Sequence, residues 1–333
     1  DFSQAANPEQ KSLLGRPAAL LIGGDISGIQ KFIYTISSKH AAKTLRGRSL
    51  YLQLLTEAML RYVLRELGIP RVNVIYSGGG HFYLLAPLSA AEKIPDIQKR
   101  ITRMLLRHHG ASLYLALASV EVPASGFRLG QFPAYWDALH TNLAQAKQQR
   151  YSELGDGLYQ EVFQPESHGG NREQMCSVCG EESEHTQLLD EEERICPLCA
   201  SFDDPLGKHL TRASFIALDL GAPAEIPVNT ALDVLAEFGM GIRLLDADGK
   251  ALGENERRVQ PERVVLWALQ DPQKWQEMAS LPAAKTIHYM VNHVPEATFD
   301  ELQKGRQGIH RLGVLRMDVD NLGSIFKDGF GIG

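Results

Sequence analysis

The stretches ALLIGGDISGIQKFIY, residues 19–34, and RLGVLRMDVDNLGSIF, residues 311–326, superpose without gaps over residues 19–33 and 312–326 when Asp25 is placed on Asp318. Self-similarity over such a distance indicates two versions of one structural unit. The later stretch reads as an apolar strand, Leu312 to Leu315, that carries polar side chains to its carboxyl end, where open α/β sheets bind ligands. The sequence therefore predicts a duplicated unit that handles nucleotides.

The two versions differ in charge. Asp318 and Asp320 flank the Val319 carbonyl, and such oxygen ligands suit Mg²⁺ that carries substrate phosphates. Asn321 can hydrogen-bond a base or a sugar. In the earlier version Ser27 replaces the second carboxylate, so we expect that version to hold a divalent metal poorly and to position a ligand. A solvated turn is the alternative, since Asp, Asn and Gly are also common in turns.

Length and composition set limits on the protein. The chain has 333 residues, is 44% hydrophobic, and carries 34 basic and 40 acidic residues for a net charge of −6. The length suggests about two domains, and the charge excludes a protein that coats nucleic acid with its whole surface. We find no membrane-spanning run and no signal segment, and we expect a cytoplasmic protein. Because the chain starts at Asp1 and ends soon after the second stretch, we expect it to be part of a longer protein.

The elements that follow the first stretch alternate in a recognisable order. Amphipathic helices are predicted at 50–67 and 91–108, and strands at 72–76, 82–86 and 112–122. With the first strand, the order is β-α-β-β-α-β, which is the ferredoxin-like signature of an α+β fold. Many functions share this fold, so the fold alone does not decide the activity.

A glycine-rich turn, Ser77-Gly78-Gly79-Gly80, joins two of these strands. Three successive glycines allow a tight reversal and leave backbone N–H groups open to an anion. A plain hairpin needs only one or two glycines, and it is the alternative. We predict that the turn faces a nucleotide.

A group of basic side chains precedes the first helix. Such a group can bind a triphosphate or an RNA backbone, or can simply be the solvated start of a helix. Its members lie within ten residues: Lys39, His40, Lys43, Arg46 and Arg48.

Four cysteines occur as two Cys-x₂-Cys pairs, Cys176 with Cys179 and Cys196 with Cys199, sixteen residues apart. Each pair can direct two thiolates to one metal, and two pairs complete a tetrahedral Zn²⁺ site. Two disulfides are the alternative, which an intracellular chain without other cysteines does not favour. Because sulfur fills all four positions, we assign the site to folding and not to catalysis.

Several of these motifs together resemble a known family, the large subunit of type III CRISPR interference complexes, most closely the Csm type. The matching pieces are residues 23–34, 41–55, 76–87, both cysteine pairs and residues 312–323. The resemblance implies two facing palm domains of the polymerase or cyclase type, which bind two ATP molecules. When the complex holds target RNA, the family joins ATP into cyclic oligoadenylate with Mg²⁺ or Mn²⁺. The implied partners are the other subunits, the guide RNA and the target RNA.

By this resemblance we divide the chain into a first palm at 1–125, a helical connector with a zinc-ribbon-like module at 126–210, a mixed linker at 211–305 and the start of a second palm at 306–333. Asp318 and Asp320 are the predicted catalytic residues. Lys39, Lys43, Arg46 and Arg48 are candidates for RNA or phosphate contact. The predicted nucleotide-binding residues are Asp25, Ser27, Gly28, Ser77, Gly78, Gly79, Gly80, Val319, Asn321 and Leu322.

Two parts of the family pattern are missing. The Gly-Gly-Asp-Asp hairpin belongs downstream of Asp320, and the chain ends before it. The adjacent His-Asp pair of the N-terminal nuclease domain does not occur either, so we expect the chain alone to be inactive. In the whole protein the predicted nucleotidyltransferase reaction is attack of a ribose hydroxyl on an α-phosphate. A diguanylate-type cyclase and a non-catalytic RNA-binding scaffold are the alternatives.

Overall fold

The computed structural model describes residues 12–36, 40–128, 130–163, 174–182, 185–189, 193–221, 230–253, 264–269 and 301. They divide into two compact units. The described parts of the first unit lie within residues 1–28 and 60–164, and those of the second lie within residues 29–59 and 165–312.

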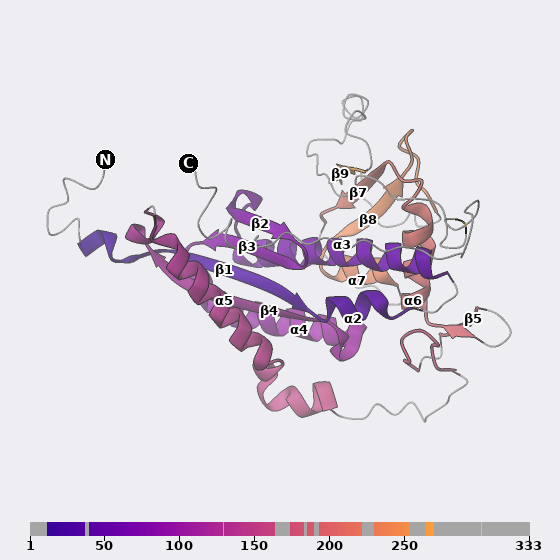
Figure 1. Ribbon diagram of the computed structural model, residues 1–333, viewed down its shortest axis with the longest axis horizontal. Coiled ribbons are helices and arrows are strands. Elements are labelled where there is room, and N and C mark those ends of the chain that lie inside the picture. The colour runs from indigo at the N-terminus through magenta and orange to yellow at the C-terminus, as the bar shows by residue number, and fades with distance from the viewer. Residues whose placement is uncertain are drawn as a thin grey trace, which may run out of the picture. The chain divides into compact units, whose positions relative to one another are not determined.

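The first unit is built on one four-stranded antiparallel sheet (Figure 1). Strand β1 pairs with β3 on one side and with β4 on the other, and β2 pairs with β3, which gives the order β2-β3-β1-β4. The central strand β1 is buried from Leu20 to Ser27, as its continuous apolar run predicts. The strands are β1 Pro17–Ser27, β2 Val74–Gly78, β3 His81–Ala86 and β4 Tyr114–Pro123.

Two helices of the first unit pack against this sheet. Helix α5, Phe132–Gln148, contacts β1 and β4, and its Trp136, Leu139 and Leu143 side chains form a core with Tyr83 and Ala116. Helix α4, Ile94–His109, contacts β4. The buried Gln98 side chain of α4 accepts a hydrogen bond from the Leu117 backbone N–H (2.8 Å) and donates one to the Leu115 carbonyl (2.7 Å). Gln98 thus satisfies backbone groups on the edge strand β4.

Helix α3, Ala41–Leu67, starts nine residues before the predicted start at residue 50. Residues 41–49 are too polar to show a buried periodicity, so this first part of the helix has no signal in the local pattern. The boundary between the two units falls within α3. The short helix α2, Ile29–Tyr34, precedes it.

The second unit contains a three-stranded antiparallel sheet and a small hairpin. The sheet has the order β8-β7-β9, with β7 Phe215–Asp219, β8 Gly241–Leu245 and β9 Val264–Ala268. The hairpin pairs β5 Gln187–Leu188 with β6 Arg194–Ile195. Helix α6 is Pro197–Ser201, and α7 is Ala231–Glu237, which begins with a capping box between Thr230 and Asp233.

Short helical turns connect these elements. The 3₁₀ turns are Arg71–Asn73, Leu88–Lys93, Gly110–Ser112, Ala124–Phe127 and Ser152–Gly157, and the π turns are Tyr159–Phe163 and Phe202–Gly207.

The expected mixture of helices with antiparallel sheets is confirmed. Among the described helices, none is both long enough and apolar enough to cross a lipid bilayer. The predicted start of a second palm, residues 306–333, lies outside the described residues.

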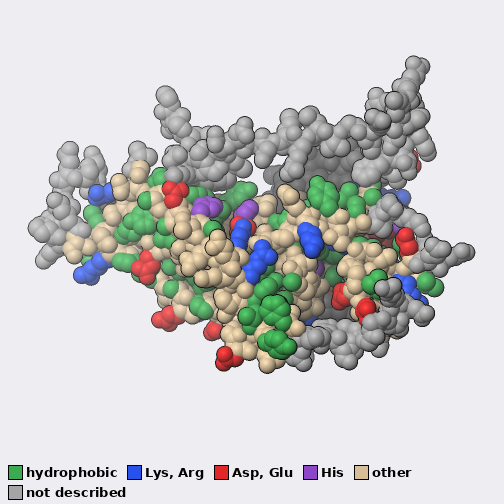
Figure 2. All heavy atoms as spheres, turned by 60° about the horizontal axis from the view of Figure 1, so that its bottom comes forward, with side chains coloured by type: hydrophobic (Ala, Val, Ile, Leu, Met, Phe, Trp, Pro, Cys, Tyr) green, Lys and Arg blue, Asp and Glu red, His purple; other side chains and the backbone are tan. Residues whose placement is uncertain are grey.

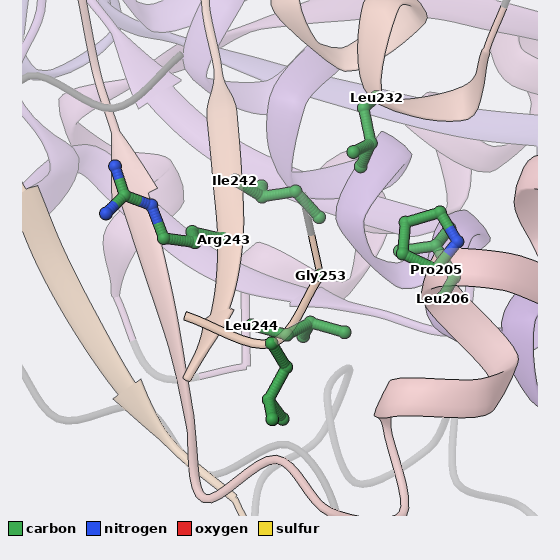
Figure 3. A pocket seen from close by; sticks show the side chains of 8 residues that line it. Pro205, Leu206, Leu232, Ile242, Arg243, Leu244 and Gly253 are labelled. Carbon is green, nitrogen blue, oxygen red and sulfur yellow. The ribbon is translucent and has the colours of Figure 1, made fainter. Parts of the chain in front are cut away.

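Among the described residues of the second unit, an apolar pocket lies between β8 and the Phe202–Gly207 turn (Figure 3). Pro205, Leu206, Leu232 and Ile242 line it.

Candidate functional site

The carboxylate of Asp25 lies near the carboxyl end of β1 and contacts an imidazole and an ammonium group. His81 is its register partner on β3, and the His81 Nδ1 atom lies 3.3 Å from the Asp25 Oδ1 atom. The Lys147 ammonium, from the last turn of α5, forms an ion pair with the Asp25 Oδ2 atom. Asp25 is only 8% exposed, whereas His81 and Lys147 are partly exposed.

These contacts set the charge of the Asp25 carboxylate. Burial raises the pKa of Asp25, but hydrogen bonds and charge interactions with His81 and Lys147 outweigh burial and hold the pKa below its ordinary value. The carboxylate is therefore ionised at neutral pH and is already paired with a cation. A divalent metal prefers negatively charged oxygen ligands. Because the Lys147 ammonium already neutralises the charge of Asp25, this single carboxylate is a weak ligand for such a metal.

Tyr83 and His140 lie near enough to Asp25 to feel its charge. The Tyr83 hydroxyl lies 3.4 Å from the His140 Nε2 atom, and the His140 ring centroid is 5.3 Å from that of Trp136. Burial, together with the Asp25 charge, raises the pKa of Tyr83 to about 12. Burial, together with the charge of His81, lowers the pKa of His140. His140 is therefore neutral at pH 7.

The turn between β2 and β3 is tighter than predicted. Ser77 and Gly78 belong to β2, so the turn consists of Gly79 and Gly80 alone. Both have positive φ, 61° and 84°, as a two-residue type I′ turn requires. The Ile26 N–H donates to the Gly80 carbonyl at 2.9 Å, which ties the turn to β1 next to Asp25. A Cβ at Gly79 would meet nothing within 4 Å, so this backbone is open to a ligand.

Gly28 ends the β1 segment before helix α2. Its φ is +94°, and a Cβ placed there would lie 1.9 Å from the Ser112 carbonyl oxygen. Only glycine fits both conditions. The structure thus brings together, at the end of β1, the predicted Asp25, Ser27 and Gly28 and the glycine turn.

Three residues of this site were missed in the sequence. His81 follows the glycine turn directly, and that adjacency was a usable signal. His140 and Lys147 come from a segment that was interpreted as a connector, and no local pattern links them to Asp25. The predicted residues Asp318, Val319, Asp320, Asn321, Leu322 and Lys39 lie outside the described residues.

The four cysteines form one cluster in the second unit. Their Sγ atoms all lie within 4.8 Å of one another, and the Cys179 and Cys196 sulfurs are 3.8 Å apart. None is in a disulfide, and all but Cys179 are buried. Zn–S bonds of about 2.3 Å in a tetrahedron place sulfurs about 3.8 Å apart. The predicted set is confirmed as a group that could hold a metal such as zinc.

Local backbone geometry supports the two cysteine pairs. The Gly180 N–H donates to the Cys176 carbonyl at 2.9 Å and closes the first loop. In the second, the Cys199 N–H donates to the Cys196 sulfur at 3.4 Å. These contacts direct the sulfurs of each pair to the same side.

The basic group on α3 is divided between solvent and interior. Lys43 and Arg46 are half-buried, whereas Arg48 is 2% exposed and donates to the Phe32 carbonyl at 2.8 Å. The prediction that Arg48 contacts RNA or phosphate is therefore corrected, since its guanidinium is enclosed by the protein. On the face in Figure 2, acidic and basic side chains of the described residues are interspersed.

Comparison with known proteins identifies relatives along nearly the whole chain. Residues 18–166 match the family described as Csm1 subunit domain B. The CRISPR system single-strand-specific deoxyribonuclease Cas10/Csm1 (subtype III-A) of Mycobacterium tuberculosis is 31% identical over 349 residues, which cover 99% of this chain and 40% of that protein. The protein of the same description from Methanocaldococcus jannaschii is 30% identical over 93% of this chain and 41% of its own length. The chain thus spans about two fifths of these curated relatives.

Solved structures share the fold. A chain in the crystal structure of the Csm1-Csm4 subcomplex of the type III-A CRISPR-Csm interference complex matches with a TM-score of 0.63 and 24% identity, over 97% of this chain and 38% of that one. A chain of the Csm1-Csm4 cassette in complex with AMPPNP matches with a TM-score of 0.61 and 25% identity, over 95% of this chain and 37% of that one. A chain of the cassette in complex with cA4 matches with a TM-score of 0.58 and 24% identity, over 93% of this chain and 36% of that one. From these matches along nearly its whole length, we conclude that the chain belongs to the Csm1 (Cas10) family of subtype III-A CRISPR systems.

Proposed function

We propose that this chain contributes an ATP-binding palm to a type III-A CRISPR effector subunit, and that the full-length protein is a nucleotidyltransferase that makes cyclic oligoadenylate when target RNA is bound. The observation that carries this proposal is the site at the end of β1, where the Asp25–Lys147 ion pair lies beside an open glycine turn. Solved relatives with AMPPNP and with cA4 bound support the choice of an adenine nucleotide.

The first sheet supports the assignment of a ferredoxin-like palm. A β-α-β-β-α-β chain that folds this way has an antiparallel sheet with β1 and β3 in the centre, and the order β2-β3-β1-β4 agrees with that arrangement. The division at residues 125, 210 and 305 remains our proposal. We also propose that the cysteine cluster is a zinc-ribbon-like module whose zinc is structural, because sulfur would fill every position of the metal.

The first palm would bind the nucleotide through the Lys147 ammonium and the His81 imidazole, which Asp25 holds in place. Lys147 and His81 are partly exposed, so each can offer hydrogen atoms to a phosphate while contacting Asp25. The open Gly79 backbone and the Ser27 and Gly28 segment would lie against the same ligand. This arrangement agrees with the expectation that the first palm binds a nucleotide without its own metal.

The second palm would supply the metal site. Asp318 and Asp320, with the Val319 carbonyl, have the oxygen ligands that suit Mg²⁺ or Mn²⁺, and Asn321 and Leu322 would border the nucleotide. When bound, the metal polarises the α-phosphate and eases loss of the ribose hydroxyl proton. The carboxylates would hold that position while the first palm orients the second ATP. Pyrophosphate is the leaving group.

The proposed partners are the other subunits of the complex, the guide RNA and the target RNA. Lys43, Arg46 and Lys39 remain candidates for contact with a phosphate backbone. The role implies a cytoplasmic protein.

The test uses the full-length protein in its complex, with target RNA, ATP and Mg²⁺. We expect Asp318→Asn to abolish cyclic oligoadenylate, measured by chromatography, while assembly and RNA binding stay intact. Asp248→Asn, at an exposed turn after β8, is the matched control and should leave the product yield unchanged. A full yield from Asp318→Asn would refute the assigned role. Product from GTP alone would favour a diguanylate-type cyclase, and RNA binding without any product would favour a scaffold.

A further inference from the structure

The second unit encloses an arginine against the cysteine cluster. Arg48, on α3, is 2% exposed, and its Nη2 atom donates to the Cys199 sulfur at 3.4 Å. Its Nη1 atom donates to the Phe32 carbonyl at 2.8 Å. A guanidinium stays charged in proteins, so this buried cation requires a compensating negative group.

Packing fixes the direction of this guanidinium. Its Cζ atom lies 4.7 Å from the ring centroids of both Phe32 and Phe202, and those rings meet edge to face. Phe202 begins the turn that follows the second cysteine pair. A Cβ at Gly47 would lie 1.7 Å from the Phe202 carbonyl oxygen, so the backbones of α3 and this turn touch. Arg48 therefore cannot swing away without moving the helix.

We propose that Arg48 is a positioning residue that serves as a permanent counter-charge for the metal at the four-cysteine cluster and links metal binding to the placement of α3. The inference rests on the proposed metal at that cluster. A divalent zinc with four thiolates carries a net charge of −2, and enclosing that charge without compensation is unfavourable. The Arg48 N–H bond to Cys199 offsets part of the charge. In turn, the bound metal keeps the sulfurs ionised, which stabilises the buried guanidinium.

The test uses the full-length protein in two measurements. In the first, the protein is loaded with Co²⁺, whose absorption spectrum reports sulfur ligands. In the second, it is loaded with Zn²⁺, and the release of zinc to a chelator is followed. Arg48→Met removes the charge and keeps an elongated side chain, whereas Arg48→Lys keeps the charge without the planar donor pair. Loss of a partner of a metal ligand typically weakens binding about 10- to 100-fold, and we expect this loss for Arg48→Met. The sulfur-to-cobalt charge-transfer band should move to lower energy, because the Cys199 sulfur loses a hydrogen bond. Arg48→Lys should lie between Arg48→Met and the wild type.

Arg212→Met, at an exposed arginine of the same unit, is the matched control and should change neither reading. A wild-type protein without a tetrathiolate cobalt spectrum would overturn the metal assignment itself. Suppose that the wild-type protein has that spectrum, but the Arg48 variants show an unmoved band and unchanged zinc release. That result would overturn only the role of Arg48. If Arg48→Met does not fold, the band and release rate of Arg48→Lys decide by the same criteria.

Discussion

Replacement of Gly28 by alanine tests whether the path of the chain at the end of β1 is as tight as the structure shows. Two penalties combine at this residue. Its φ of +94° is unfavourable for a residue with a Cβ, and that Cβ would lie 1.9 Å from the Ser112 carbonyl oxygen. Because Ser112 contributes a backbone atom, the contact cannot be relieved by rotating a side chain.

The expected cost follows from the two penalties. The left-handed conformation costs roughly 1–2 kcal/mol for a non-glycine residue. Overpacking of a tight contact adds about 1–3 kcal/mol. Gly68→Ala is the matched control, because Gly68 has φ of +72° and an added Cβ there would meet nothing within 4 Å, so it bears only the first penalty. We therefore expect Gly28→Ala to be less stable than Gly68→Ala by about 1–3 kcal/mol.

Urea denaturation of the chain, followed by circular dichroism, measures this difference. With a slope of about 2 kcal/mol per M, the midpoint of Gly28→Ala should fall roughly 1 M below that of Gly68→Ala. Equal midpoints for the two variants would show that the close approach of Gly28 to Ser112 is wrong.

Two further predictions concern the ion pair and its surroundings. Lys147→Met leaves the Asp25 carboxylate without its ammonium partner, so we expect the pKa of Asp25 to rise, as an NMR titration would measure. We also expect the KM for ATP of the full-length protein to increase in steady-state kinetics. An unchanged KM would contradict the phosphate role of Lys147. Partial burial lowers the pKa of His140 below its ordinary value, so around pH 6.5 the unfolded chain binds more protons than the folded chain. Stability should therefore fall as the pH decreases through about 6.5, by a small amount because solvent screens this exposed side chain. His140→Phe should reduce this fall in the urea midpoint, and an identical fall in the variant and the wild type would refute the lowered pKa of His140.

The parts of the fold that the sequence predicted well are those with a local pattern. The continuous apolar run of β1, the presence of a glycine turn and the spacing of the cysteines each report a short-range constraint. The structure agrees with all three, although the turn consists of Gly79 and Gly80 alone. The early start of α3 was missed because its first turns lack a buried apolar face and are held by contacts such as that of Gly47 with Phe202.

The charged residues show the limit of such reasoning. Arg48 and Arg46 are alike in sequence, yet Arg48 is enclosed and bonded to a cysteine 151 residues away. Lys147 reaches Asp25 from the last turn of α5. Both contacts depend on which helix face meets which strand or loop, and that information is absent from local spacing.

We propose that the two palms have separate roles: the palm with Asp25 binds a nucleotide, and Asp318 and Asp320 of the other palm bind the metal. The most direct measurement is cyclic oligoadenylate synthesis by the full-length complex, titrated separately with Mn²⁺ and with ATP. We predict that Asp318→Glu raises the Mn²⁺ concentration needed for half-maximal rate, whereas Asp25→Asn raises the KM for ATP and leaves the Mn²⁺ requirement unchanged. The account would be contradicted if Asp25→Asn raised the Mn²⁺ requirement as much as Asp318→Glu does and left the KM for ATP unchanged.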